Sequence, residues 1–106
     1  ETYEVIWLNK HRESGEGYDL VIKKGGVVIE YIEVKSKVGT EAEFVSASGK
    51  QWETARSLFD RNEGDKYSFY VVTNTGKPDA KIRSLINPIK LWKEGKLYAH
   101  PVNFKL

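Results

Sequence analysis

The first third of the chain carries three apolar runs, which polar or glycine-containing segments separate. Residues 5–8 and 18–23 are short runs that predict strands. Residues 27–35 form the longest run rich in β-branched side chains, and its nearly continuous apolar character predicts a central strand. Gly25 and Gly26 lie between the second and third runs and supply the backbone freedom of a tight turn. The pattern therefore predicts a hairpin whose second strand is central in a sheet.

The apolar periodicity becomes helical over residues 49–61. The stripe that recurs there consists of Trp52, Ala55, Leu58 and Phe59. Ser48 precedes this segment as a candidate N-cap, and Gln51 lies three residues later as the partner of a capping box. Gly64 follows as a stop signal, so we expect one helix with a single buried face.

The second half of the chain predicts further strands and one more helix. Residues 67–73 alternate and are rich in aromatic and β-branched side chains, which is typical of a strand. Residues 80–86 are ambiguous, with a strand favoured, and residues 44–46 and 96–106 are candidates for short strands. Residues 87–95 begin with Asn-Pro and end at a glycine, as a short helix does. The order of these elements predicts an α/β (α+β) layer fold.

Composition narrows the classes of protein that fit. The chain has 106 residues and a net charge of +2, which suits one globular domain and gives only weak support for a polyanion partner. It contains no cysteine, which excludes disulfides, thiolate zinc sites and cysteine nucleophiles. No apolar run approaches the ~20 residues that cross a bilayer, so we expect no membrane partner. The absence of cysteine favours a cytoplasmic protein. Because methionine is absent, we expect residues 1–106 to be a single domain of a longer protein.

Three of the charged side chains in the second and third apolar runs are spaced so that they can meet. Residues two apart in a strand share a face, so Glu33 and Lys35 are expected to point the same way, opposite to Val34. If the two runs pair, Asp19 can join them. Two carboxylates and an ammonium suit metal-assisted phosphodiester cleavage, because carboxylate oxygens hold Mg²⁺, for which Mn²⁺ can substitute. The residues alone leave an alternative open, a same-face surface ion pair worth about 0–1 kcal/mol.

The order of these charged residues resembles the PD-(D/E)XK nuclease superfamily, with a tyrosine in place of the proline before the first acid. The chain also contains the segments Val5-Ile6-Trp7-Leu8, Gly17-Tyr18-Asp19-Leu20, Tyr31-Ile32-Glu33-Val34-Lys35, Ser46-Ala47-Ser48 and Ile86-Asn87-Pro88. In these segments it more closely resembles the family named after the plant NO VEIN protein. Together they extend over nearly the whole chain.

The resemblance implies a restriction-endonuclease-like fold, in which helices flank a mixed central sheet, and a DNA endonuclease that requires Mg²⁺. Asp19, Glu33 and the backbone carbonyl of Val34 would hold the ion. Lys35 would orient the attacking water or stabilise the phosphate, and Gln51 would close the active site. The resemblance also implies a setting in a restriction or anti-phage defence protein, with other domains or a second copy of the chain as partners.

A helix that precedes the first strand in that superfamily often supplies a further acid, and we expect this chain to lack that helix. Glu1 and Glu4 are candidates for the acid only by their position. The alternative function is therefore a catalytically inactive module that binds nucleic acid or another protein with the same fold. Gln51 can also be a capping residue alone, and Trp7 and Trp52 are expected in the core rather than as base-stacking platforms.

Overall fold

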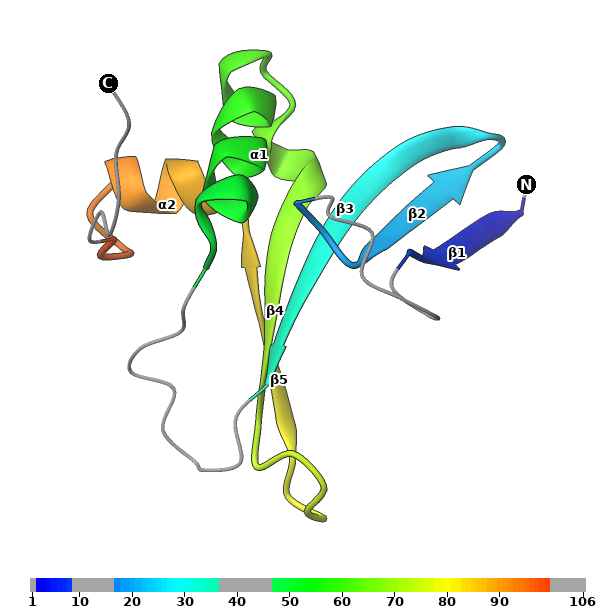
Figure 1. Ribbon diagram of the computed structural model, residues 1–106, viewed down its shortest axis with the longest axis vertical. Helices are drawn as coiled ribbons and strands as arrows, with labels where there is room; N and C mark the ends of the chain where they lie inside the picture. Colours follow the sequence, from blue (N-terminus) through cyan, green and yellow to red (C-terminus); the bar gives the residue numbers. More distant parts are fainter. Residues whose placement is uncertain (1, 9–16, 37–46, 100–106) are drawn as a thin grey trace.

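A computed structural model describes residues 2–8, 17–36 and 47–99 of this chain. Five strands form one sheet in the order β1-β2-β3-β4-β5 (Figure 1). The strands are β1 (Tyr3–Trp7), β2 (Leu20–Lys24), β3 (Val27–Ser36), β4 (Tyr67–Thr73) and β5 (Lys81–Ile86). Neighbouring strands run antiparallel except β3 and β4, which are parallel. The sheet is therefore mixed, and β3 is its central strand, as predicted.

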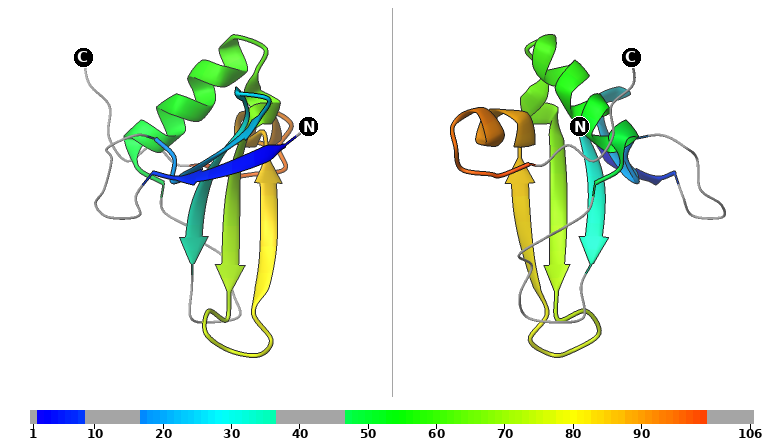
Figure 2. Two further views of the ribbon diagram at one scale, coloured as in Figure 1. Left: turned by 90° about the vertical axis from the view of Figure 1, so that its right-hand side faces the viewer. Right: turned by 60° about the vertical axis from the view of Figure 1, so that its left-hand side comes forward.

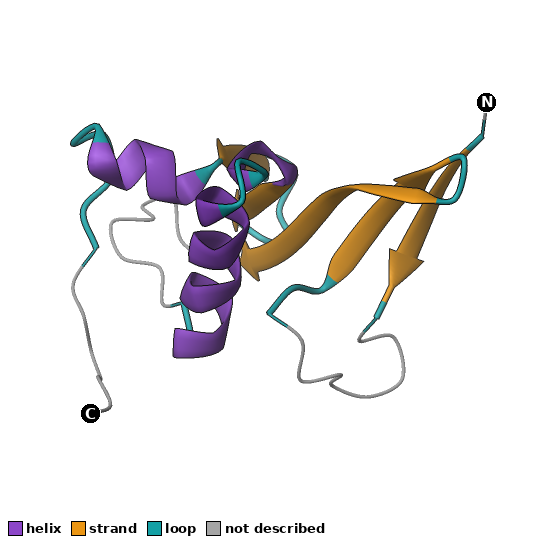
Figure 3. Ribbon diagram, turned by 90° about the horizontal axis from the view of Figure 1, so that it is seen from above, coloured by secondary structure: helices purple, strands orange, loops and turns teal. Residues whose placement is uncertain are grey.

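Two α-helices and one short 3₁₀ helix accompany the sheet. They are α1 (Gly49–Asp60), η1 (Gly64–Lys66) and α2 (Pro88–Lys93). Helix α1 lies in the connection between the parallel strands β3 and β4, which is the usual way to join parallel neighbours. Figure 3 shows both α-helices gathered at one side, while the sheet extends away from them toward β1. Figure 2 shows that β3, β4 and β5 continue past the helices at their lower ends. The predicted α+β fold is confirmed.

The main core forms where α1 and α2 meet one face of β4. Its buried side chains are Ala55, Leu58, Tyr67, Phe69 and Ile89. Trp52 and Phe59 pack against this cluster in partly buried positions, so the predicted apolar stripe of the helix is confirmed. Tyr67 and Phe69 reach the helices together because residues two apart on a strand point to the same face.

Left-handed backbone conformations set two of the chain reversals. Gly25 and Gly26 have φ angles of 58° and 80° and connect β2 directly to β3, which confirms the predicted hairpin. Asn87 has a φ angle of 57°, and its side chain accepts a hydrogen bond at 3.4 Å from the backbone amide three residues on. Pro88 follows in the first turn of α2, as predicted. The ambiguous residues 80–86 contain β5, which leads into this cap.

Some expectations differ from the structure. Trp7 is 56% exposed instead of buried, because it lies on the outer strand β1, beyond the helices. Tyr18 and Asp19 precede β2 instead of forming its first residues, and residues 96–99 form no strand. None of the described helices is long and apolar enough to cross a membrane. The other positions with expectations, residues 1, 44–46 and 100–106, lie outside the described residues.

The face of the sheet opposite the helices carries apolar side chains that contact solvent. On the outer strands these are Val5, Trp7, Ile82 and Ile86, each of which is more than half exposed. Strand alternation places them there, because the neighbours of each along the strand point to the helix side. The two faces of the sheet therefore differ, with the main core on one face and exposed apolar side chains on the other.

We expect Leu58→Ala to lower the free energy of unfolding by about 2–5 kcal/mol, because the change leaves a cavity among buried side chains. The matched control is Ile82→Ala, which changes a side chain that is 67% exposed and should stay within about 0.5 kcal/mol of the wild type. Urea unfolding followed by tryptophan fluorescence measures both. Equal losses for the two variants would contradict the position of the core.

Candidate functional site

The pairing of β2 with β3 decides to which face of the sheet the Asp19 side chain points. A bulge that follows Ile22 shifts the register of the hairpin by one residue between the turn and the site. Leu20 consequently pairs with Ile32, and the Asp19 amide donates to the Ile32 carbonyl at 2.8 Å. The ladder ends at this pair, and the Asp19 side chain lies beside Glu33, whose carboxyl it affects by its charge and by a hydrogen bond. Without the shift, each residue of β2 before Lys23 would pair one residue earlier on β3 and would point to the other face.

The same register directs backbone groups of β3 toward Asp19. One Asp19 carboxylate oxygen accepts a hydrogen bond from the Val34 amide at 3.0 Å. In a strand the N–H and C=O of one residue point to the same edge, so the Val34 carbonyl is directed to the edge at which Asp19 lies. The structure therefore brings the carboxylates of Asp19 and Glu33 close to the backbone of Val34, which are the groups that the sequence analysis selected.

Gln51 joins helix α1 to the charged residues of β3. Its Nε2 donates to Glu33 Oε2 at 2.7 Å, and its Oε1 accepts from Lys35 Nζ at 2.8 Å. Lys35 Nζ also lies 3.5 Å from Glu33 Oε2, so the three side chains form a closed triangle. Because a carboxylate only accepts and an ammonium only donates, these two partners fix the orientation of the Gln51 amide.

Gln51 also completes the cap of α1. The Ser48 hydroxyl accepts from the Gln51 amide at 3.2 Å, and Gln51 Oε1 accepts from the Ser48 amide at 2.9 Å. The predicted capping box is confirmed. The sequence left open whether Gln51 caps the helix or belongs to the site, and the structure shows that it caps the helix while contacting the charged pair of β3.

Burial governs the charge of Glu33, which is only 5% exposed. Burial raises the pKa of Glu33 above its ordinary value, and the Asp19 charge raises this pKa further, whereas the Lys35 ammonium lowers it. Lys35 keeps 20% of its side chain exposed and so faces both Glu33 and solvent. Two crowded carboxylates, one of them buried, favour the binding of a divalent cation, because its charge offsets their repulsion.

A buried contact holds the segment that leads into Asp19. The hydroxyl of Tyr67, a fully buried residue, donates to the Gly17 carbonyl at 2.6 Å. Gly17 packs so closely on α1 that an added Cβ would lie 2.7 Å from Thr54 Cβ and 2.9 Å from the Lys50 carbonyl oxygen. Burial, with the nearby carboxylates, raises the pKa of Tyr67 and keeps its hydroxyl protonated as a donor. The sequence analysis missed this contact, for which a tyrosine opening a buried strand was the available signal.

The oxygen atoms at this position are of the kind that a hard cation such as Mg²⁺ prefers. Asp19 and Glu33 could contribute carboxylates and Val34 a backbone carbonyl. Among the described residues, no group of three or more His, Cys, Asp or Glu side chains could hold a metal ion. Glu4, a candidate for a further acid only by its position, pairs with Lys23 near the hairpin turn, at the far end of β2 from Asp19.

Comparison with known proteins identifies relatives of the chain. The family model described as Protein NO VEIN, C-terminal, matches residues 1–85. The protein NO VEIN-LIKE of Arabidopsis thaliana is 35% identical over 95 residues, which are 88% of this chain and 13% of that protein. The protein NO VEIN of the same plant is 33% identical over 93 residues, which are 88% of this chain and 3% of that protein. The chain thus spans a small part of the length of these relatives, and no solved structure matches it.

We expect Gly17→Ala to lower the free energy of unfolding by about 1–3 kcal/mol, because the new methyl group would clash with α1. Gly49→Ala is the matched control, since nothing lies within 4 Å of a Cβ added there. Urea unfolding of the two variants compares them. A Gly17→Ala protein that is as stable as the Gly49→Ala protein would show that the segment before Asp19 is not packed against the helix.

We expect the free energy of unfolding of the protein without divalent cations to fall as pH rises through the pKa of Glu33. That pKa lies above its ordinary value of 4.5, so the unfolded chain loses this proton at lower pH than the folded protein, and ionisation favours unfolding. Glu33→Gln cannot ionise, so it should lose this pH dependence and be more stable than the wild type at neutral pH. Urea unfolding in EDTA from about pH 4 to about pH 8 measures the effect.

Glu53→Gln is the control for this pH series. Hydrogen bonding to Arg56 lowers the pKa of Glu53. Ionisation of Glu53 therefore stabilises the folded protein, whereas ionisation of Glu33 destabilises it. The Glu53→Gln protein should therefore keep the fall in stability that the wild type shows. A Glu33→Gln protein with the pH dependence of the wild type would contradict the raised pKa of Glu33.

Proposed function

The chain belongs to the NO VEIN C-terminal family, and we propose that it is a Mg²⁺-dependent endonuclease domain that hydrolyses phosphodiester bonds in DNA. One observation carries the proposal. The carboxylates of Asp19 and Glu33 and the ammonium of Lys35 lie close together beside the backbone of Val34. Phosphodiester hydrolysis needs a ligand set for a cation and a positive group for the phosphate, and these residues can supply both.

Asp19, Glu33 and the Val34 carbonyl would hold the cation. The bulged hairpin fixes Asp19, and the amide of Val34 restrains its carboxylate through the bond at 3.0 Å. The raised pKa of Glu33 supports this assignment, because a buried carboxylate beside another one gains most when a cation arrives. A bound Mg²⁺ would polarise the scissile phosphate by its positive charge.

Lys35 and Gln51 would complete the site. The Lys35 ammonium is partly exposed beside Glu33, where it could contact a phosphate or the attacking water without leaving the sheet face. Gln51 would hold Glu33 and Lys35 in a fixed relation, because its amide contacts both at less than 3 Å. The start of α1, which the capping box sets, would thereby close one side of the site.

We further propose that the substrate is cytoplasmic DNA and that the domain acts in a restriction or anti-phage defence protein, beside other domains or as a homodimer. The resemblance of Asp19 and the Glu33-Val34-Lys35 segment to PD-(D/E)XK nucleases supports this setting. The mixed sheet with a helix between its parallel strands is compatible with that resemblance.

Plasmid cleavage in the presence of Mg²⁺ or Mn²⁺ tests the proposed activity. We expect Lys35→Ala and Asp19→Asn each to lower the cleavage rate by about 100-fold or more, the usual effect of losing one charge-stabilising contact. Lys90→Ala is the matched control, because it removes an exposed cation of α2, outside the site, and should leave the rate unchanged. Cleavage at the wild-type rate by both site variants would contradict the proposal.

Calorimetry with Mn²⁺ separates ion binding from catalysis. Asp19→Asn and Glu33→Gln should lose the binding, whereas Lys35→Ala, which removes no ligand, should keep it, and thermal unfolding shows that each variant is folded. DNA binding that weakens steeply with salt but leads to no cleavage would favour the alternative, an inactive nucleic-acid-binding module. A stable complex with a partner protein, without DNA binding, would favour a protein-interaction module.

A further inference from the structure

The sheet face that carries Lys35 continues across β4 onto β5. Lys35 lies opposite Val71 in the β3–β4 ladder, and Val71 lies opposite Arg83 in the β4–β5 ladder. Lys81 lies opposite Thr73, two residues beyond Val71 on the same strand. Because residues opposite each other in a sheet share a face, all three cations stand on the face of the candidate site. We call Lys35, Arg83 and Lys81 the basic row.

The two cations of β5 are exposed, and no acidic side chain of the described residues pairs with them. Arg83 and Lys81 are both exposed, and within the described ranges neither forms an ion pair. Elsewhere carboxylates lie within 3.2 Å of the cationic groups of Arg56, Arg61, Lys66 and Lys96. The charges of Arg83 and Lys81 are therefore available to a ligand, unlike those of these four residues.

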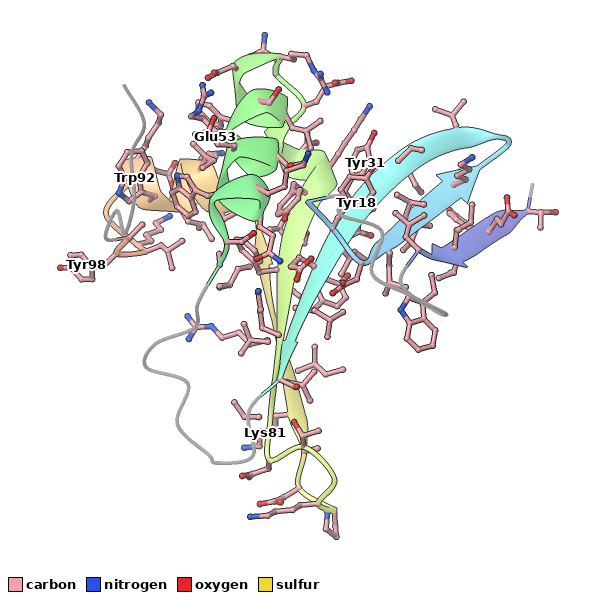
Figure 4. The ribbon with its side chains drawn as sticks, in the orientation of Figure 1. Tyr18, Tyr31, Glu53, Lys81, Trp92 and Tyr98 are labelled. Carbon is pink, nitrogen blue, oxygen red and sulfur yellow. The ribbon has the colours of Figure 1, made fainter. Side chains whose placement is uncertain are left out.

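Lys81, at the β5 end of the basic row, lies where the helices leave the sheet open. Figure 4 shows Lys81 near the lower end of the sheet, well below α1 and α2. Glu33 lies on the same face, since Glu33 and Lys35 are two residues apart on β3. A ligand that reaches from the carboxylates along this face would meet Lys35, Arg83 and Lys81 in turn.

We propose that the basic row binds the sugar–phosphate backbone of a DNA duplex beside the phosphate at Asp19 and Glu33; this inference rests on the proposed function. Neighbouring strands lie about 4.8 Å apart, so Lys35 and Arg83 are separated by about 10 Å of sheet. A DNA strand advances about 3.4 Å per phosphate along its axis, so a strand that lies along this span places more than one phosphate on it. Arg83 and Lys81 hold the flanking phosphates, and Lys35 faces the phosphate next to the carboxylates.

Salt-dependent DNA binding tests the basic row independently of cleavage. Binding of a short fluorescent duplex is measured by anisotropy over a series of salt concentrations in EDTA, where no metal-dependent cleavage occurs. The Arg83→Gln/Lys81→Gln double variant should lower the magnitude of the slope of log K against log salt by about 1.8, since each lost phosphate contact removes about 0.9. Its affinity at about 0.1 M salt should fall by roughly 50-fold or more for the same reason.

Two further variants make the result specific. Arg83→Lys/Lys81→Arg keeps both charges and should retain the wild-type slope, which shows that the strand still folds and pairs. Lys90→Gln/Lys93→Gln removes two cations from α2 and should also retain it. The basic row is overturned if the wild type shows no salt-sensitive binding, if the slope of the β5 double variant is unchanged, or if the α2 variant loses as much.

The outcomes for the basic row and for the nuclease are distinguishable. Plasmid cleavage that depends on Lys35 and Asp19, together with an unchanged slope in the β5 variant, leaves the nuclease standing and overturns the basic row. A reduced slope without any cleavage supports the basic row as a DNA-binding surface and removes only the proposed hydrolysis.

Discussion

A one-residue bulge in the β2–β3 hairpin is the constraint on which the candidate site depends. The two glycines of the turn begin the hairpin in a register that would set Asp19 opposite Ile32, on the face of the sheet away from the helices. The shift after Ile22 brings it beside Glu33 instead, the residue that Gln51 of α1 contacts. Every later relation at the site follows from this shift, including the bond from the Val34 amide and the crowding of the two carboxylates.

The burial of Glu33 explains why the helix and the site are built together. A carboxylate on the central strand of a sheet loses contact with water and must find partners in the protein. Gln51 and Lys35 are those partners, and Gln51 reaches Glu33 because the capping box begins α1 at this point. Tyr67 of β4 donates a hydrogen bond to Gly17, and Gly17 packs against α1. Strand β4 and helix α1 therefore both fix the position of the segment that leads into Asp19.

The sequence predicted the parts of the structure that local chemistry decides. Alternation along β3 placed Glu33 and Lys35 on one face, and Ser48 with Gln51 located the start of α1. The bulge was not predictable, because nothing in the pattern of the two strands indicates an extra residue opposite Ile22. The burial of Trp7 was predicted wrongly, because an apolar residue gives the same sequence signal on a covered strand and on an outer strand. The face of Arg83 required the pairing of β5 with β4, which depends on tertiary contacts.

The amide of Gln51 has a consequence for how variation at this position would be interpreted. Its oxygen serves the first turn of α1 and the Lys35 ammonium at once, so one atom supports both the fold and the chemistry that we propose. A mutational scan would score the position as intolerant, but it would not show whether the helix cap or the contact with Lys35 had been lost. During evolution the two properties would also be inherited as one trait, because no single substitution here can relax the helix start while sparing the charged pair.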